Sequence, residues 1–236
     1  MKVVSSYRLH RTGDIACRDL TPSALKQLSA GAAQLGIRLT PDALGRLGRY
    51  EELLVEGNRR INLISRADVH RIAGYHFLDS IAAAPLLPPD CRLCDVGSGA
   101  GLPGIPLKIV RDDISLVMIE SIRKKALFLD LTIRQLELSR SCVWHRRAEE
   151  VREEKFDVVT CRLLGTIRDL APLVEPLLGP GGFAVFYKSA TLESEIAESQ
   201  PVLDRLRLHV REVRELHLPP PSRLARRLAV IARAGK

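Results

Sequence analysis

Residues 94–107 read Cys94-Asp95-Val96-Gly97-Ser98-Gly99-Ala100-Gly101-Leu102-Pro103-Gly104-Ile105-Pro106-Leu107, and this stretch decides the fold. Residues 92–96 have the apolar pattern of a short strand, and the glycines at alternate positions after it allow a tight turn. Pro103 or Pro106 can then occupy the first turn of a helix that runs towards Arg111. Because N–H groups at a helix start are unpaired, a ligand can approach the main chain where glycine has no side chain. The stretch therefore predicts a ligand-binding turn, which we call the glycine cradle (residues 97–102).

The chain after residue 89 alternates between strand-like and helix-like patterns. We expect strands over residues 92–96, 115–120, 141–146, 156–161, 182–188, 207–216 and 228–233, and helices over 105–110, 123–138, 167–178 and 193–206. This alternation predicts an α/β fold in which a mostly parallel, seven-stranded sheet carries helices on both faces. The last two strands, joined across a proline-rich stretch, are expected to pair as an antiparallel hairpin at one edge. Ligands of such sheets bind at the carboxyl ends of the strands, where the cradle lies.

The region before the sheet is predicted to be helical. Leucines and alanines recur at helical spacing over residues 21–36, Thr40 and Pro41 start a second helix that ends near Asn58, and residues 72–84 form a third. We expect three parts: a flexible extension over residues 1–20, a helical segment over 21–89 packed on the core, and a ligand-binding α/β domain over 90–236.

The composition favours a polyanionic partner. The formal net charge is +8 and the pI is about 9.5, which suit RNA, DNA or an anionic membrane surface. Aromatic residues make up only 4%, which argues against a surface that binds single strands mainly by stacking. No apolar run is long enough to span a bilayer, and five irregularly spaced cysteines fit a reducing compartment. We therefore expect a cytoplasmic protein with no membrane partner.

Two acidic residues narrow the ligand. Asp95 ends the first predicted strand, where a carboxylate repels a pyrophosphate but suits a cationic ligand. Glu120 ends the second, where its carboxylate can accept hydrogen bonds from ribose hydroxyls. S-adenosylmethionine combines a nucleoside with a sulfonium and an ammonium, so these acids favour it over a dinucleotide. The alternatives are that Asp95 caps the following helix and that Glu120 is a solvated strand end.

The cradle and its surroundings resemble a known family. Residues 95–107, and the Leu102-Pro103-Gly104-Ile105-Pro106 part above all, resemble the signature of the bacterial 16S ribosomal RNA guanine-N7 methyltransferases. Residues 58–65 and 76–80 match upstream blocks of that family, and residues 147–150 and Arg162 match downstream ones. Gly57, Leu163 and Ser189 depart from its pattern. The likeness covers about residues 22–233.

The resemblance implies a class I methyltransferase (Rossmann-like) fold, S-adenosylmethionine as methyl donor and guanine N7 in a loop of 16S rRNA as acceptor. The partner would be 16S rRNA or the small ribosomal subunit, and we expect a monomer. Together with the acids above, the predicted cofactor-binding residues are Asp95, Gly97, Gly99, Gly101, Leu102, Glu120, Ala148, Glu149 and Arg162.

Guanine N7 has a lone pair and no proton, so methyl transfer requires positioning and no catalytic base. We therefore assign no acid or base and no metal. The substrate-side candidates are Arg162, His76 and Asn62. The RNA-binding candidates are the basic residues near the predicted strand ends, namely Arg59, Arg60, Arg66, Arg123, Lys124, Lys125 and Arg147.

Two other functions remain open at this stage. Cys161 follows the fourth predicted strand, where a thiolate could attack cytosine C6 before methylation at C5. A non-catalytic module that binds S-adenosylmethionine and associates with the ribosome would also need a cradle and a basic surface. The Cys91-x-x-Cys94 pair has redox or zinc spacing, but it lacks a second pair and falls at a buried strand.

Overall fold

The computed structural model describes residues 22–162, 165–188, 191–217 and 225–234. The predicted flexible extension, the proline-rich joint of the last hairpin, and Leu163 and Ser189 lie outside the described residues. In the described ranges, the structure has no helix with the length and apolarity needed to cross a lipid bilayer.

The centre of the fold is a seven-stranded sheet in the order β3-β2-β1-β4-β5-β7-β6. Its strands are β1 (Arg92–Val96), β2 (Ser115–Ile119), β3 (Ser141–Trp144), β4 (Phe156–Arg162), β5 (Leu178–Lys188), β6 (Leu208–His217) and β7 (Ala225–Arg233). The first five strands are parallel, and β7 runs antiparallel between β5 and β6. The predicted sheet and its terminal hairpin are confirmed.

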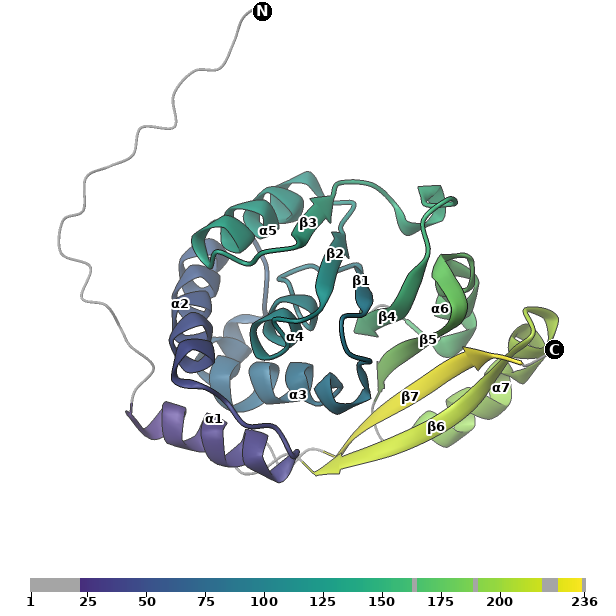
Figure 1. Ribbon diagram of the computed structural model, residues 1–236, viewed down its shortest axis with the longest axis horizontal. Helices are drawn as coiled ribbons and strands as arrows, with labels where there is room; N and C mark the ends of the chain where they lie inside the picture. The colour runs from purple at the N-terminus through teal and green to yellow at the C-terminus, as the bar shows by residue number, and fades with distance from the viewer. Residues whose placement is uncertain (1–21, 163–164, 189–190, 218–224, 235–236) are drawn as a thin grey trace, which may run out of the picture.

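Helices cover both faces of the sheet (Figure 1). Helices α1 (Pro22–Gln34), α2 (Pro41–Asn58), α4 (Gly104–Val110) and α5 (Arg123–Gln135) pack on one face, and α6 (Ile167–Val174) and α7 (Leu192–Arg205) pack on the other. Of two short 3-10 turns, η4 (Ala148–Glu150) lies between β3 and β4, and η5 (Glu175–Leu177) joins α6 to β5. Thr40 caps α2 through a hydrogen bond from Ala43 N to its hydroxyl, as its position before Pro41 predicts.

The prediction of one regular α-helix over residues 72–84 is wrong, because the helical turns there are of three different types. The chain there consists of a 3-10 turn η1 (Arg66–Arg71), a π-helical turn η2 (Ile72–Phe77), a short α3 (Leu78–Ile81) and a second 3-10 turn η3 (Ala84–Leu86). Every residue from 75 to 84 is buried, so packing from all sides, and not an amphipathic period, sets its backbone. Turns of the π type often occur at functional sites.

The helical segment shares its hydrophobic core with the sheet. Leu28 of α1 and Leu47 of α2 belong to the same buried cluster as Leu93 of β1, Val158 of β4 and Val230 of β7. A second cluster lies on the other face, between the sheet and the helices α6 and α7. Because no separate core underlies residues 22–89 within the described chain, we expect them to unfold together with the sheet.

Replacing Leu47, which is fully buried, by alanine tests this expectation. The lost burial and the cavity should lower the free energy of unfolding by about 2 to 5 kcal/mol. Trp144 on β3 is the chain's single tryptophan, so its fluorescence reports on the sheet while circular dichroism reports on the helices. Both signals should shift together in a urea titration, whereas Leu127→Ala, at a side chain that is 60% exposed, should change stability by less than about 0.5 kcal/mol. Two separate transitions would contradict a shared core.

Candidate functional site

The candidate site lies beside β1, where the order of the strands in the sheet reverses. Strand β1 pairs with β2 on one side and with β4 on the other. From β1 the strand order continues to β2 and β3 in one direction and to β4 and β5 in the other. In such sheets the crevice beyond the carboxyl ends of the two central strands is the usual ligand site. The glycine cradle follows β1, Glu120 follows β2, and Arg162 ends β4, so these predicted residues meet at one edge.

The cradle is a turn that its own backbone holds in shape. The amides of Gly97 and Ser98 donate to the carbonyl of Ile119, which extends the pairing with β2, and the amide of Gly101 donates to Ser98 O at 2.7 Å. Gly99 has a φ of +57°, and only the carbonyl of Gly97, at 3.7 Å, would lie near a Cβ there. The cradle is therefore open above Gly99, as a turn that receives a ligand must be.

Tyr50 of α2 supports the cradle from below, a contact that the sequence did not reveal. Its hydroxyl donates to the carbonyl of Ala100 at 2.6 Å, and its buried ring stacks on Phe77 with 5.3 Å between centroids. A Cβ on Gly101 would lie 2.8 Å from this hydroxyl. The only signal in the sequence is a tyrosine in line with the leucines of the buried face of α2, which does not say where its hydroxyl binds.

Glu120, which follows β2, is hydrogen-bonded to the cradle. One carboxylate oxygen accepts the amide of Gly99 at 2.9 Å and the other accepts the amide of Ile122 at 2.7 Å, so the side chain, only 5% exposed, ties the cradle to the start of α5. Each carboxylate oxygen has a second lone pair. Glu120 is therefore not the solvated strand end that was one of the two alternatives from the sequence. Its carboxylate can still accept further hydrogen bonds on the side of the cradle.

Asp95 is placed beneath the cradle. Its carboxylate is fully buried, with one oxygen accepting the amide of Gly104 at 3.2 Å and the other accepting the hydroxyl of Thr160 at 2.9 Å. Burial raises the pKa of this carboxyl to about 6, although the hydrogen bond from Thr160 opposes the shift. The hydrogen bond from Gly104 agrees with the second alternative from the sequence, in which Asp95 caps the first turn of α4.

Arg162 extends from the end of β4 into contact with η2 and α3. Its Nη1 donates to Ser80 Oγ at 2.8 Å and to the carbonyl of His76 at 3.4 Å, and its Nη2 lies 2.6 Å from His76 Nδ1. Its Nε lies 3.2 Å from the Asp79 carboxylate. Two substrate-side candidates, Arg162 and His76, therefore lie together and buried, whereas Asn62 is exposed in the loop that follows α2.

The hydrogen bond from Arg162 sets the state of His76. A guanidinium only donates, so Nδ1 must accept and the proton of the neutral ring lies on Nε2. Nε2 has no hydrogen-bond partner among the described residues, and the nearest carboxylate oxygen, on Asp68, is 3.9 Å away. Burial, followed by the positive charge of Arg162, lowers the pKa of His76 to about 4.

The remaining cofactor-binding candidates flank the cradle. Leu102, at the end of the cradle, is partly buried and packs against the core. Ala148 is buried and Glu149 is exposed, both in η4 after β3. Because β3 pairs with β2, η4 lies at the same edge of the sheet as Glu120.

Most of the basic candidates are exposed around this edge. The exposed members are Arg59, Arg60, Arg66, Arg123, Lys124 and Arg147, and Lys125 is partly buried. The end of α2 packs closely on the middle of α5, since a Cβ on Gly57 would lie 2.7 Å from the Phe128 ring. Arg59 and Arg60 therefore follow a helix that lies against α5, whose first turn carries Arg123 and Lys124. The tight contact also explains why a small residue stands at position 57.

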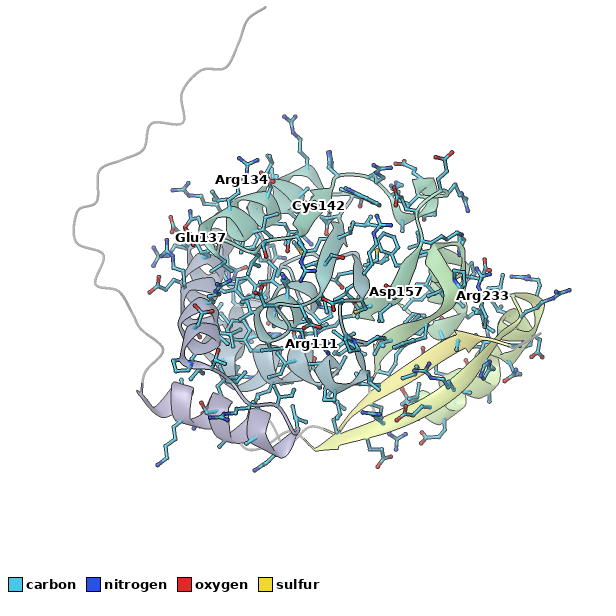
Figure 2. The ribbon with its side chains drawn as sticks, viewed as in Figure 1. Arg111, Arg134, Glu137, Cys142, Asp157 and Arg233 are labelled. Carbon is cyan, nitrogen blue, oxygen red and sulfur yellow. The ribbon has the colours of Figure 1, made fainter. Side chains whose placement is uncertain are left out.

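Two surface hollows lie at the opposite edge of the sheet. One, of about 420 Å³, lies between α5 and β3, where Arg134, Glu137 and Cys142 line it (Figure 2). The other, of about 250 Å³, is lined by Asp90, Asp157 and Phe183. Both are at the amino-terminal ends of the strands, so shape alone does not identify the site.

The three buried cysteines of the described chain, Cys91, Cys94 and Cys161, lie in settings that disfavour the reactive thiolate. Cys161 is 1% exposed in the core cluster under α6, and burial raises the pKa of its thiol well above the ordinary range. Burial also raises the pKa of Cys91, to about 11, and that of Cys94. Within the described ranges no group of three or more histidine, cysteine, aspartate or glutamate side chains is arranged to hold a metal ion.

Gly101→Ala tests the packing of the cradle. A side chain at this φ of +93° is strained, and its Cβ would lie 2.5 Å from Ile105 Cδ1, so we expect a loss of about 2 to 4 kcal/mol in the free energy of unfolding. Gly99→Ala is the matched control, because it has the strained φ but open space and should lose only about 1 kcal/mol. Equal losses in urea titrations of the two variants would refute the support by Tyr50 and Ile105.

His76→Asn tests the titration of the buried histidine. The folded pKa of His76 is about 4 and the unfolded one about 6.5, so between these values the unfolded chain binds more protons. The contribution of His76 to stability is therefore present above pH 6.5 and is lost as the pH falls towards 4. The difference in unfolding free energy between wild type and variant should fall by roughly 1 to 2 kcal/mol from pH 7.5 to pH 5. Asp95 and Glu51, whose raised pKa values act in the opposite direction, are common to both proteins and cancel.

Comparison with known proteins identifies the family. The family model described as rRNA small subunit methyltransferase G matches residues 44–224. The ribosomal RNA small subunit methyltransferase G of Desulfitobacterium hafniense is 33% identical over 190 residues, which are 78% of this chain and 79% of that protein. The protein of the same name from a Geobacter species is 35% identical over 214 residues, 89% of this chain and 98% of its own length.

A solved structure agrees in fold. The ribosomal protein L11 methylase of Lactobacillus delbrueckii subsp. bulgaricus superposes with a TM-score of 0.53 at 15% identity, over 68% of this chain and 79% of that one. At this identity the likeness concerns the arrangement of strands and helices only. The predicted fold class and family are confirmed: the chain is a class I methyltransferase by fold and belongs to the rRNA small subunit methyltransferase G family.

Proposed function

We propose that the protein transfers a methyl group from S-adenosylmethionine to N7 of a guanine in small-subunit ribosomal RNA. The observation that carries the proposal is the arrangement at the carboxyl edge, where an open glycine cradle lies between Glu120, which follows β2, and Arg162 of β4. The family to which the chain belongs supports the choice of reaction and substrate.

The residues at the cradle suit the proposed donor. The open side of Gly99 leaves room for a nucleoside against the main chain. The free lone pairs of Glu120 can accept the ribose hydroxyls, and η4, with Ala148 and Glu149, would meet the adenine edge. Arg162 would hold the carboxylate of the methionine part through its positive charge and its remaining Nη2 hydrogen, because Ser80 and His76 accept its other Nη hydrogens. Bound there, S-adenosylmethionine supplies a methyl group activated by a positively charged sulfur.

The acceptor requires orientation and no deprotonation. Guanine N7 attacks with its own lone pair, so the side chains of this site need only align it with the methyl group and exclude water. Positive charge develops on the purine during transfer, and Glu120 and Glu149 provide negative charge at this edge. His76 is buried behind Arg162, so we assign it to holding Arg162 and leave Asn62 as the candidate that faces RNA.

The exposed basic residues support RNA as the partner. Arginine and lysine in the first turn of α5 oppose the helix dipole, and phosphate contacts with counterion release would compensate for that unfavourable placement. A solvated positive face without a ligand is the alternative for any one of these clusters. We further propose that the protein acts as a monomer in the cytoplasm, where 16S rRNA or the small subunit is available.

Methylation at cytosine C5 is disfavoured by one observation. That reaction needs a thiolate at the ligand, whereas Cys161 lies in the core beneath α6 and its pKa is raised by burial. A non-catalytic module is the remaining alternative, and only an activity measurement separates it from the enzyme.

The test is incubation of the protein with labelled S-adenosylmethionine and either undermethylated 16S rRNA or small subunits, followed by location of the modified base. Wild type should label a guanine at N7, and Arg162→Ala should lose about 10- to 100-fold in kcat/KM, since charge-assisted hydrogen bonds to the donor disappear. Cys161→Ala is the matched control at the adjacent position and should retain wild-type turnover. Absence of label from both substrates, although S-adenosylmethionine binds, would favour the non-catalytic module.

A further inference from the structure

A buried charge cluster joins the helical segment to the two halves of the sheet. It consists of Asp79 and Ser80 of α3, His76 of η2, Arg162 of β4 and Arg226 of β7, and we call it the Asp79 cluster. The Asp79 side chain is 1% exposed, with its two oxygens 3.2 Å from Arg162 Nε and 3.3 Å from Arg226 Nε. Neither contact has hydrogen-bond geometry within the described chain, so the charges themselves hold the three groups together.

The cluster fixes the orientation of Arg162. Its guanidinium donates three hydrogen bonds, to Ser80 Oγ and to the carbonyl and Nδ1 of His76. Ser80 is itself anchored, because its hydroxyl donates to His76 O at 2.6 Å and its carbonyl accepts the hydroxyl of Tyr187 on β5 at 2.7 Å. The guanidinium therefore has one well-defined position at the end of β4, and the acceptors that define it belong to η2 and α3.

Stability alone does not account for this arrangement. A buried ion pair rarely stabilises a fold more than apolar side chains of the same volume, because the charges lose their hydration. Removing one partner, however, leaves the others buried without compensation. Among the described residues, Asp79 is the only acidic side chain within ion-pair distance of Arg162, and the same carboxylate also pairs with Arg226. The cluster therefore keeps charged side chains buried next to Arg162, at the carboxyl end of β4.

We infer that Asp79 is a positioning residue: by pairing with Arg162 and Arg226 it holds the Arg162 guanidinium in place for the carboxylate of S-adenosylmethionine. The inference rests on the proposed function in that it takes Arg162 as the group that binds the donor. Asp79 touches neither the donor nor the RNA in this scheme. It acts through Arg162. Because Asp79 lies in α3, the helical segment contributes to donor binding through this side chain.

The experiment uses the full chain with Asp79→Asn, which keeps the volume and removes the charge. In metal sites, residues that orient a ligating side chain contribute about 10-fold or more in affinity, and we expect an effect of the same order here. We expect calorimetry to show S-adenosylmethionine binding about 10-fold more weakly, with no change for 5′-methylthioadenosine, which lacks the amino-acid part. In an Arg162→Gln background Asp79→Asn should have no further effect on S-adenosylmethionine affinity.

Two further variants separate positioning from folding. Asp113→Asn removes one partner of the Arg111–Asp113 pair at the opposite edge of the sheet, and it should lower the melting temperature without changing either affinity. Ser80→Ala removes a single acceptor from Arg162 in a position where alanine suits the helix. It should weaken S-adenosylmethionine binding by a few-fold and keeps the inference testable if Asp79→Asn does not fold.

The inference is overturned if Asp79→Asn, or Ser80→Ala in its place, lowers the melting temperature but binds S-adenosylmethionine like wild type. Equal weakening for S-adenosylmethionine and 5′-methylthioadenosine also overturns it, because that pattern indicates general distortion of the crevice. If wild type binds S-adenosylmethionine but methylates no rRNA, the proposed function fails while the binding comparison still decides the role of Asp79.

Discussion

The shape of the glycine cradle depends on backbone groups that are held from three sides. Tyr50 of α2 binds the carbonyl of Ala100, Glu120 after β2 binds the amide of Gly99, and Asp95 of β1 binds the amide of Gly104 just beyond the cradle. A loop made of glycines loses much conformational entropy when it becomes ordered, so hydrogen bonds of this kind are needed to keep it in one conformation. The cradle is a property of the whole fold, since these side chains come from three different elements.

The same edge combines groups of opposite charge at different depths. Asp95 and the Asp79 cluster are buried, Glu120 lies at the crevice, and Arg59, Arg60 and Arg123 are exposed farther out. Negative charge near the cradle suits a cationic donor, and positive charge outside it suits a phosphate backbone. A surface of one sign could not serve both ligands.

The sequence predicts those parts of the site that depend on position along the chain. Asp95, Glu120 and Arg162 are correctly placed at strand ends, because the alternation of strands and helices fixes where a parallel sheet exposes its edge. The orientation of a side chain is a different matter. The carboxylate of Asp95 turns inward to α4, and nothing in its sequence neighbourhood distinguishes that from an outward direction.

Long-range partners account for what was missed. Tyr50 meets Ala100 across 50 positions, and Arg162 meets Ser80 across 82, so local periodicity holds no trace of either contact. Residues 72–84 were predicted as one regular helix, although they form a π-helical turn and a short α3, because burial on all sides removes the amphipathic signal that marks helix ends. The family resemblance identified this region as important without indicating what its residues touch.

The position of β7 has a consequence for the order in which the site is completed during synthesis. Strand β7 pairs with β5 and supplies Arg226, yet it is translated after every other strand of the sheet. Until β7 has left the ribosome, one edge of β5 is unpaired and Asp79 lacks one of its two arginines. A nascent chain that already contains the cradle, Glu120 and Arg162 therefore still lacks the strand that stands between β5 and β6 and the second arginine of the Asp79 cluster.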